Sequence, residues 1–600
     1  MALALTAACG TVILTQQPAQ AVGENISVTL TTADLQQALT PQPGIALGAV
    51  SSGAVNLSVD NTETYQTIDG FGAAFTDSSA YLLHEQLDAT TRDRVMHDLF
   101  DRGTGIGLSF MRVPMGASDY TATPADNPAP YSYDDTCCDL SNFSIDHDRA
   151  YIIPILRQAQ ALNLEMKLFA TAWSAPAWMK QNNSMLGGSD AYIRQDMYEE
   201  YTEYNIRFLQ AYEAAGVDVW GLTPLNEPSL APPSYPQMLM TAEDHARLIT
   251  DHFVPALQEA GLDTVILGAD DVTVNRAYAS TLLNNPGVYD AIYGTAWHCY
   301  GDDLHNMRWI QDTWPDKPIY ETECSTGPGI APMNAAQLAL ESTFNGASGV
   351  QTWNLALDTN GGPKMGVGCE RCTGLITIDQ NTGTVSYNDN YYQLGHFSKF
   401  VEPGATRIGY SDGGNVWAQA YRNPDGSEVL VAHNNNTTAT GFTVTWNSSG
   451  SFQYELPAGA TVTFTKSPNN GTAQIRGQAS GRCLDDTGNP ANGVQQYIWD
   501  CGTGSANQYY LYSAARELRI AGKCLSADGN GTANGTDVIT WDCNGTRSQQ
   551  WTFHADGSIT NDLSGRCLDV TGLATANGSA VQLWSCHGGS NQKWTASNGA

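Results

Sequence analysis

Between Tyr65 and about Leu357, short apolar runs alternate with longer amphipathic stretches. The apolar runs have the length of buried strands, which we expect at 68–75, 106–113, 166–171, 219–224, 265–268, 292–297, 319–322 and 350–353. Helical spacing of apolar residues is found between them at 151–162, 198–214 and 242–260. This alternation predicts a (β/α)8 barrel over residues 65–400. A doubly wound open sheet is the alternative, although no Gly-x-Gly-x-x-Gly motif follows the first strand.

The pattern changes to strict alternation after residue 400. Four runs that begin at Val416, Val429, Phe442 and Thr461 place apolar residues at every second position, with turn-forming residues between them. We expect a small β-sandwich over residues 401–466, to which strand-like residues 22–64 contribute. Residues 1–21 form a separate apolar segment, and 467–472 are a linker rich in Asn, Pro and Gly.

The last part of the chain, 473–600, is a threefold repeat. Each unit contains a Gly-basic-Cys-Leu segment, then Trp-x-Cys, then Gln-x-aromatic, and the units begin near Gly481, Gly522 and Gly565. Three short β units that cannot bury a face alone are expected to share one core. The whole chain is therefore expected to be multidomain: a TIM barrel with a β-sandwich side domain, followed by an all-β trefoil.

Composition narrows the possible partners. The chain has 600 residues, of which 42% are hydrophobic, and a formal net charge of -33. These values exclude wholesale disorder and argue against nucleic acid and anionic membranes as partners, because both select basic surfaces. A neutral substrate fits better. We expect no stable membrane insertion, because no further run approaches a membrane span of about 20 apolar residues. We also expect a monomer without cofactor or metal.

The chain start and the cysteines both bear on localisation. Residues 1–21 resemble a secretory signal cut after Ala21, although no basic residue precedes the apolar run; an ordinary apolar segment is the alternative. Six of the 13 cysteines form regular pairs in the repeats, which predicts disulfides and secretion. Cys369 and Cys372 could bind zinc, but no second such pair with ligand spacing is present, and a disulfide there, with Cys137 or Cys138 as a candidate partner, is favoured. Cys299 and Cys324 are expected to be inert buried thiols.

Two glutamates stand where strands end. Glu227 follows the run 217–225 within Asn226-Glu227-Pro228, and Glu323 follows the run 318–322. Buried parallel strands that each carry a carboxylate at the C-terminal tip can bring the two acids face to face. Glycoside hydrolysis needs such a pair, because one carboxyl group protonates the leaving oxygen while the other opposes the developing positive charge. Solvated surface glutamates are the alternative.

Several blocks carry a resemblance to a known family. They are Gly70-Phe-Gly-Ala-Ala-Phe-Thr-Asp77, Arg112-Val-Pro-Met-Gly-Ala-Ser118, Trp173-Ser-Ala-Pro-Ala-Trp178-Met-Lys180, Asn226-Glu-Pro228, Trp297-His-Cys-Tyr300, Thr322-Glu-Cys324, Trp353-Asn-Leu-Ala-Leu357 and Tyr391-Tyr-Gln-Leu-Gly-His-Phe-Ser-Lys-Phe400. Together they resemble glycoside hydrolase family 30, the family of glucosylceramidases and β-1,6-glucanases, over roughly residues 60–465. The repeats resemble a ricin-type trefoil lectin, also called carbohydrate-binding module family 13.

The resemblance to family 30 implies roles at matching positions. Glu227 is similar to the acid/base and Glu323 to the nucleophile, while Glu321 is a rival that strand alternation places on the same face as Glu323. Five further residues match positions that line the sugar subsite: Asp77, Trp173, His298, Tyr300 and Trp353. If the enzyme is retaining, the two carboxyl groups lie about 5 to 5.5 Å apart, and Glu321 points away from the cleft.

Elementary chemistry adds two residues. Asn226 can hydrogen-bond a sugar 2-hydroxyl, and Arg112 can hold Glu323 ionised, with a salt bridge in the barrel floor as its alternative. Trp173 and Trp353 offer flat faces to a sugar ring, although a lone tryptophan more often packs in a core. A lone histidine such as His298 is likewise more often structural than catalytic.

Sugar binding in the repeats needs an acidic acceptor, an aromatic platform and an amide. The third repeat has all of them in Asp569, Gln582, Trp584 and Asn591. In the first repeat, Asp485, Trp499 and Asn507 are present, but Tyr497 stands where Gln582 stands. The second repeat has Ser526, Ile539 and Ser548 at the polar positions, which predicts an inactive site around Trp541. The alternative is that these tryptophans only fill the trefoil core.

Together these observations predict a secreted retaining β-glycoside hydrolase that cleaves a β-1,6-linked glucan and carries a sugar-binding module. Glucosylceramidase, β-xylosidase and β-1,6-galactanase activities are alternatives. An alternative from another class is a lectin whose barrel has lost catalysis, although the presence of both Glu227 and Glu323 argues against it.

Overall fold

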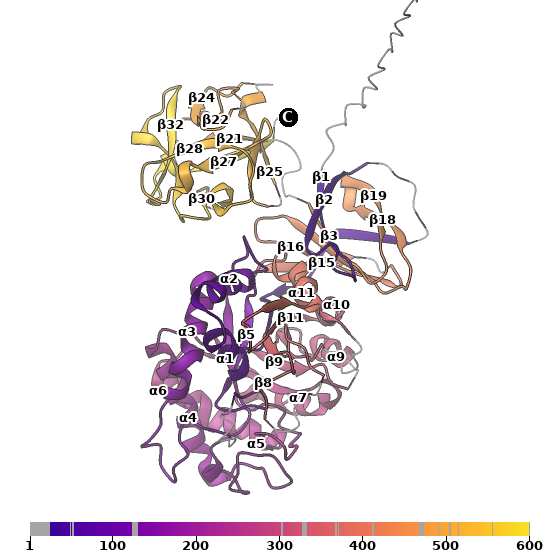
Figure 1. Ribbon diagram of the computed structural model, residues 1–600, viewed down its shortest axis with the longest axis vertical. Helices are drawn as coiled ribbons and strands as arrows, with labels where there is room; N and C mark the ends of the chain where they lie inside the picture. Colours follow the sequence, from indigo (N-terminus) through magenta and orange to yellow (C-terminus); the bar gives the residue numbers. More distant parts are fainter. Residues whose placement is uncertain are drawn as a thin grey trace, which may run out of the picture.

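The computed structural model describes residues 25–598, apart from 49, 51–52, 54, 123–129, 302–303, 327–332, 366–368, 370, 411–412, 467–472, 490, 503–505, 514 and 555. The expected signal at 1–21 and the linker at 467–472 lie outside the described residues. Figure 1 shows a helix-covered barrel, a β domain that lies against the last helices of the barrel segment, and a second β domain that contains the C-terminus.

The barrel is an eight-stranded parallel sheet in the order β4-β11-β10-β9-β8-β7-β6-β5, closed by pairing of Ala74 with Arg112. Its strands are β4 (Gly70–Ala73), β5 (Phe110–Met115), β6 (Lys167–Ala172), β7 (Gly221–Thr223), β8 (Val265–Val272), β9 (Gly294–His298), β10 (Ile319–Glu323) and β11 (Ala347–Thr352). Each expected strand overlaps one of these, so the prediction of the fold class is confirmed for the barrel.

Helices surround the sheet. They include α1 (Asp77–Glu85), α2 (Ala89–Phe100), α3 (Asp146–Leu162), α4 (Tyr198–Ala214), α5 (Ala242–Arg247), α6 (Val254–Ala260), α7 (Arg276–Leu283), α8 (Pro286–Ala291), α9 (His305–Thr313), α10 (Ala335–Phe344) and α11 (Asp389–Ser398). The residues before α2 and α10 cap the N-termini of these helices: Asp88 accepts hydrogen bonds from the amides of Thr90 and Thr91, and Asn334 forms a capping box with Gln337. Within the barrel, Phe110 stacks on Phe169 and on Tyr320, each with ring centroids 5.2 Å apart. This floor closes the end opposite the glutamates.

The side domain is a nine-stranded sheet in the order β19-β18-β3-β15-β16-β17-β20-β1-β2. Its strands are β1 (Asn25–Thr31), β2 (Thr40–Ala46), β3 (Asn56–Ile68), β15 (Ala405–Tyr410), β16 (Val416–Arg422), β17 (Glu428–Asn434), β18 (Thr440–Trp446), β19 (Gly450–Leu456) and β20 (Thr461–Lys466). Strand β1 pairs antiparallel with β20, so residues from both ends of the barrel segment build one domain, as the sequence indicates.

The C-terminal domain is an all-β trefoil whose first strand, β21 (Ala473–Gly477), pairs with its last, β33 (Trp594–Asn598). Each repeat joins a Cys-bearing strand to a Trp-bearing strand: β22 (Cys483–Asp485) to β24 (Tyr497–Trp499), β27 (Lys523–Ala527) to β28 (Thr536–Trp541), and β31 (Cys567–Val570) to β32 (Ser579–Trp584). Trp551 and Trp594 lie in the shared core. The expectation of a trefoil is confirmed.

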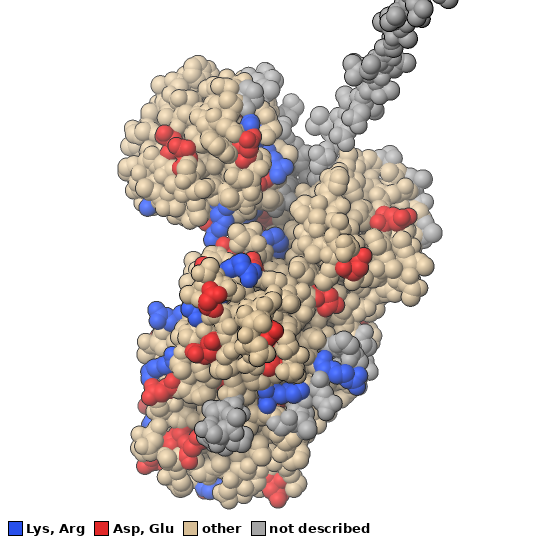
Figure 2. All heavy atoms as spheres, viewed as in Figure 1, with Lys and Arg blue, Asp and Glu red and all other residues tan. Residues whose placement is uncertain are grey.

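The trefoil contacts the rest of the chain through ion pairs. Arg547 lies 3.8 Å from Asp101, which follows α2, and Arg516 lies 3.8 Å from Glu402, which precedes the side domain. Lys and Arg side chains are visible near this junction in Figure 2, and the rest of that face shows acidic and basic residues interspersed without a large basic patch. Among the described residues, no helix combines the length and the apolar character needed to cross a membrane.

Within the part of the chain that the structure describes, disulfides join all 12 cysteines. The pairs are 137–138, 299–324, 369–372, 483–501, 524–543 and 567–586. The expectation that Cys299 and Cys324 are free thiols is therefore wrong: they bridge the ends of β9 and β10, directly beside His298 and Glu323. This pairing could not be predicted from the sequence, because only the folded barrel brings the ends of the two strands together.

Candidate active site

The two expected carboxylates meet at the C-terminal mouth of the barrel. Glu227 lies four residues beyond the end of β7, and Glu323 is the last residue of β10. One carboxylate oxygen of each and a ring nitrogen of His298 all lie within 4.8 Å of one another, and all three residues are buried. This closeness fits the separation of about 5 to 5.5 Å of retaining glycosidases, and not the wider gap of inverting ones.

Glu227 is held in an unusual backbone conformation. Its φ is +41°, in the left-handed region that side chains other than glycine rarely adopt. The Glu227 amide donates to the carbonyl of Asp270 at 2.8 Å. The side-chain amide of buried Gln237 donates to the carbonyls of Asn226 (2.6 Å) and Glu227 (3.0 Å). These bonds fix the direction of the carboxylate and offset the cost of the conformation.

Arg112 links three polar side chains of the site. From β5 it donates to Glu323 Oε2 (2.5 Å), Asn226 Oδ1 (2.7 Å) and Asp270 Oδ2 (2.8 Å). Trp173 lies against the guanidinium, whose central carbon is 4.5 Å from the ring centroid. Trp353 stacks on Trp173 with centroids 5.2 Å apart. Both tryptophans are nearly fully buried, so in this structure they support Arg112 as well as border the site.

His298 connects the acids on the other side. One ring nitrogen lies 2.9 Å from Glu227 Oε1 and the other 3.2 Å from Asp270 Oδ1. Burial disfavours the charged ring, but the carboxylates of Glu323 and Asp270 outweigh burial and raise the pKa of His298 well above its usual value. Burial acts against the charge of Asp270 too, and Arg112 and His298 nevertheless lower the pKa of its carboxyl group.

Glu323 is surrounded by donors. Besides Arg112, the Tyr300 hydroxyl donates to Glu323 Oε1 at 3.0 Å. Burial raises the pKa of Glu323, the charges of His298 and Arg112 oppose that shift, and the charge of Glu227 adds to it. Burial and the charge of Glu323 raise the pKa of Tyr300 well above its usual value, so its hydroxyl stays protonated as a donor.

Glu321, the rival acid, does not face the cleft, as expected for a retaining pair of Glu227 and Glu323. The expectation that it shares a face with Glu323 is wrong, because the β10–β9 register shifts between these two residues. Tyr320 points to the barrel floor, and Glu321 lies on the outer side near the Cys299–Cys324 disulfide. Burial raises the pKa of Glu321 to about 8. Because of this bulge, the Glu323 side chain points into the mouth of the barrel and the Glu321 side chain does not.

Asp77 is not brought together with the other expected site residues. It starts α1, and its buried carboxylate accepts hydrogen bonds from the amide of Ala122 (2.7 Å) and the hydroxyl of Tyr151 (2.9 Å), and lies 2.7 Å from His147 Nε2. These partners take up its oxygens in a network beside α3. A role of Asp77 in sugar binding therefore stays a prediction.

Two acids that sequence reasoning missed belong to the site. Asp270 links Arg112 to His298, as described above. Asp119 is buried, its Oδ1 has no hydrogen-bond partner among the described residues, and burial, then Glu323 and Glu227, raise its pKa to about 8. Asp270 ends an apolar run just as Glu323 does, and Asp119 immediately follows the quoted block 112–118. Both signals were therefore present in the sequence.

Three groups of side chains within the described residues have the types and spacing of metal ligands. Two of them contain Cys299 with Cys324, or Cys524 with Cys543, whose sulfurs are engaged in disulfides and offer no thiolate. The third is Glu227, His298 and Glu323, where Arg112 already supplies a positive partner for Glu323 and the Tyr300 hydroxyl a further hydrogen bond.

The third trefoil repeat forms a buried polar cluster beside an exposed ring. Asp569 accepts hydrogen bonds from Asn591 (2.7 Å), Gln592 (2.9 Å) and Gln582 (3.1 Å). The neighbouring Trp584 is 39% exposed, which excludes it from the core. The carbonyl oxygen of the Asn591 side chain is buried and has no partner among the described residues. The cluster can therefore offer an acceptor and a platform to a ligand.

The other repeats differ at the positions expected from the sequence. Asp485 accepts hydrogen bonds from Asn507 (2.9 Å) and Gln508 (2.8 Å), and pairs across the strands with Tyr497 as Asp569 pairs with Gln582. In the second repeat the same positions hold Ser526 and Ile539. Trp499 and Trp541 are 48% and 42% exposed, so neither fills the core.

A barrel with facing carboxylates at its mouth, joined to a trefoil with exposed platforms, defines a glycoside hydrolase with a lectin-type module. Family comparison agrees: the glycosyl hydrolase family 30 TIM-barrel domain matches residues 68–401, its β-sandwich domain 404–464, and the ricin-type β-trefoil lectin domain 471–598. The chain belongs to glycosyl hydrolase family 30 and is an enzyme of the glycosidase class. The hypothesis of a lectin that has lost catalysis is therefore rejected.

The relatives of this chain include proteins that are named for two different activities. An endo-1,6-β-D-glucanase of Aspergillus fumigatus is 32% identical, over 68% of this chain and 87% of the relative. The lysosomal acid glucosylceramidase of Mus musculus is 27% identical, over 67% of this chain and 82% of the relative. Among solved structures, an endo-β1,6-glucanase is similar with a TM-score of 0.66 and 28% identity, over 74% of this chain and all of that one.

Proposed function

We propose that the protein is a secreted, retaining β-glycosidase that cleaves β-1,6-linked glucan. The observation that carries the mechanism is the buried cluster of Glu227, His298 and Glu323 within 4.8 Å, with Arg112 bound to Glu323. The donors on Glu323 favour its ionised form as the nucleophile. We assign Glu227 as the acid that protonates the leaving oxygen.

The reaction then has two displacements. Glu323 attacks the anomeric carbon while Glu227 gives its proton to the glycosidic oxygen, so that a glycosyl ester forms and the aglycone leaves as an alcohol. Glu227, now ionised, takes a proton from water, and the hydroxide oxygen attacks the same carbon and releases Glu323. His298 lies within hydrogen-bond distance of Glu227 Oε1 and holds that carboxyl group in place through both steps.

Sugar contacts are assigned to the polar groups around the pair. We assign Asn226 to the 2-hydroxyl, where a hydrogen bond strengthens in the transition state. Asp119, whose pKa of about 8 leaves it protonated at neutral pH, can donate to a second hydroxyl and accept from a third. Trp173, Tyr300 and Trp353 complete the wall of the site.

The choice of glucan follows the relatives that are named endo-1,6-β-D-glucanases, and the trefoil supports a polymeric substrate, because added binding sites increase avidity on long chains. Glucosylceramidase is the second candidate, since the mouse relative carries that name. The 12 disulfide-bonded cysteines support action outside the cell. A monomeric state stays a prediction.

A substrate panel tests this proposal. Purified full-length protein is incubated with β-1,6-glucan, glucosylceramide, xylan and β-1,6-galactan, and the products are sized over time. Rapid release of gluco-oligosaccharides from β-1,6-glucan, initially with the β configuration at the new reducing end, supports a retaining endo-glucanase. Faster cleavage of glucosylceramide, or release of the α anomer first, would contradict the substrate or the stereochemistry.

A further inference from the structure

A second cavity lies at the opposite end of the barrel from the carboxylates. It has a volume of about 610 Å³ and is lined from α6 by Val254, Leu257 and Gln258, and from the strand starts by residues 264–266, 290–293 and 316–318. Strands β8, β9 and β10 begin there, whereas Glu323 ends β10. Its size falls within the range of about 300 to 1,000 Å³ typical of small-molecule sites.

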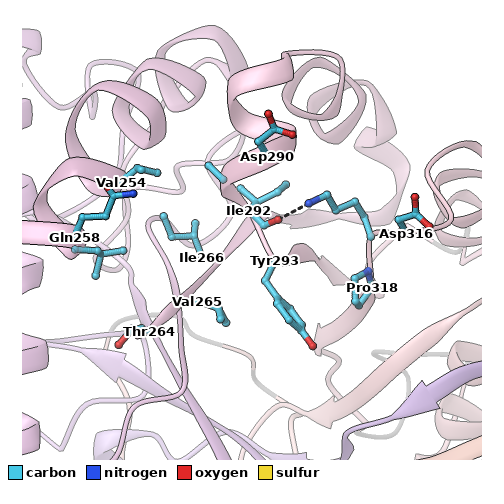
Figure 3. Close-up of a pocket in the computed structure, with 13 residues that line it drawn as sticks. Val254, Gln258, Thr264, Val265, Ile266, Asp290, Ile292, Tyr293, Asp316 and Pro318 are labelled. Carbon is cyan, nitrogen blue, oxygen red and sulfur yellow. Dashed lines mark hydrogen bonds between the residues drawn. The ribbon is translucent and has the colours of Figure 1, made fainter. Parts of the chain in front are cut away.

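The lining combines apolar residues with polar ones. Val254, Ile266 and Pro318 belong to the wall, and Figure 3 places Gln258 on one side and Asp316 on the other. Tyr293 projects between Val265 and Pro318. A ligand with an apolar face and hydrogen-bond donors matches this lining, and a sugar ring has both.

Tyr293 is positioned as a platform. It is 41% exposed, and its ring packs edge-to-face on Trp220 with centroids 5.5 Å apart and an interplanar angle of 84°. Tyr320 lies on the same side at 6.4 Å. Because its neighbours already hold the ring, a ligand that stacks on it does not have to order it first.

The charged side chains around the cavity disfavour an anionic ligand. Lys317 donates to the carbonyl of Ile292 at 2.7 Å and lies 4.5 Å from the Tyr289 ring centroid. Burial lowers the pKa of Lys317, while Asp290 and Asp316 act to raise it. The only cation of the lining is thus engaged within the protein, and two carboxylates at the rim repel phosphate or sulfate groups and can accept hydrogen bonds from hydroxyls.

We propose that this cavity binds a short segment of a neutral glycan, with one sugar ring stacked on Tyr293 and with Gln258, Asp290 and Asp316 around it at the rim. It is a site separate from the catalytic cleft and from the trefoil. That the glycan is β-1,6-glucan rests on the proposed function, whereas the preference for a neutral sugar rests on the cavity alone. A polymer could then be held at three places on one molecule, which increases avidity.

Amide hydrogen exchange tests the site locally. Full-length Glu323→Gln protein, which should not consume the ligand, is titrated with a β-1,6-linked gluco-oligosaccharide. We expect slower exchange in peptides that cover 286–293 and 314–320, at the base of the barrel. In Tyr293→Ala the half-saturating concentration for this protection should rise roughly tenfold, as expected for removal of an aromatic anchor. Tyr65→Ala, which truncates a tyrosine of 43% exposure on the side domain, is the matched control and should change nothing.

The remaining outcomes are decisive as well. If Tyr293→Ala fails to fold, Gln258→Ala and Asp316→Asn at the rim replace it, with the same expectation of weaker protection. Protection of the cleft without protection at 286–293 and 314–320, or equal protection in the variants, overturns the proposal. If the gluco-oligosaccharide protects neither place, the proposed substrate is wrong; xylo- and galacto-oligosaccharides are then compared, and no protection of the cavity by any of them overturns the site too.

Discussion

The catalytic mouth and the third trefoil repeat use the same residue types in opposite ways. Both hold a buried carboxylate among hydrogen-bond donors, which are Arg112 and Tyr300 in the mouth and amide side chains in the repeat. In the mouth, Trp173 and Trp353 are nearly fully buried and stacked behind Arg112, while in the repeat Trp584 is 39% exposed. A buried, charged site can stabilise developing charge, because its dipoles are fixed before the reaction starts. An exposed platform can only bind. The difference predicts which substitutions affect rate and which affect binding.

The largest effect is expected from Glu323→Gln. Without the nucleophile, no glycosyl ester forms, and kcat should fall on the order of 10⁴-fold or more on polymer and aryl glycoside alike. Azide added to the Glu323→Gln protein should restore part of the turnover of an activated aryl glycoside and give a glycosyl azide of inverted configuration. Recovery of a retained azide would instead place the nucleophile elsewhere.

Glu227→Gln should separate substrates by leaving group. Polymer hydrolysis should fall by about 10² to 10⁴-fold, because a sugar alkoxide needs a proton to leave. The first step on an aryl glycoside with an acidic phenol should be spared, and a burst of phenol should precede slow turnover. Stopped-flow release of the phenol measures both phases. Equal losses on both substrates would exclude Glu227 as the acid.

Gln237→Ala should have a smaller effect of the same kind. Gln237 holds the carbonyls of Asn226 and Glu227, so its loss should misdirect the acid and reduce polymer kcat by about 10 to 100-fold, as for a buried hydrogen bond of about 1 to 3 kcal/mol. Aryl glycosides with good leaving groups should be affected less. Gln351→Ala is the control: this buried glutamine bonds to the carbonyl of Phe110 and should lower stability without dependence on the leaving group.

Glu321→Gln should change stability rather than rate. The pKa of Glu321 is about 8 in the folded protein against a usual 4.5, so the native state binds the extra proton between these values. Its contribution to stability is therefore full below about pH 4.5 and is lost as pH rises towards 8. A neutral amide avoids this loss, and the variant should gain up to about 1.4 kcal/mol per pH unit over that interval relative to the parent. Tm measured at pH 5 and pH 8 tests this; a shift that is the same at both would contradict it.

The mouth of the barrel also shows what the sequence could predict. Glu227 and Glu323 were identifiable because each follows an apolar run, and periodicity sufficed for the barrel strands. Glu321 was misplaced because a bulge, which period-two reasoning cannot anticipate, lies between it and Glu323. The Cys299–Cys324 disulfide depends on which strand ends become neighbours, and only the closed barrel determines that.

The smallest effect on rate is expected in the trefoil, from a matched pair of substitutions. Trp584→Ala and Trp541→Ala remove rings of similar exposure, 39% and 42%, so their costs to folding should be alike. Trp584 stands beside the cluster of Asp569, Gln582 and Asn591, whereas Trp541 stands beside Ser526 and Ile539, which offer no carboxylate or amide. Binding to insoluble β-glucan should therefore weaken in Trp584→Ala, by roughly tenfold, and change little in Trp541→Ala. Hydrolysis of a small aryl glycoside should stay the same in both, because the mouth is complete without the trefoil. Pull-down isotherms, with Tm recorded for each variant, decide the matter: equal loss of binding at equal Tm would mean that polar anchors do not distinguish active from inactive repeats.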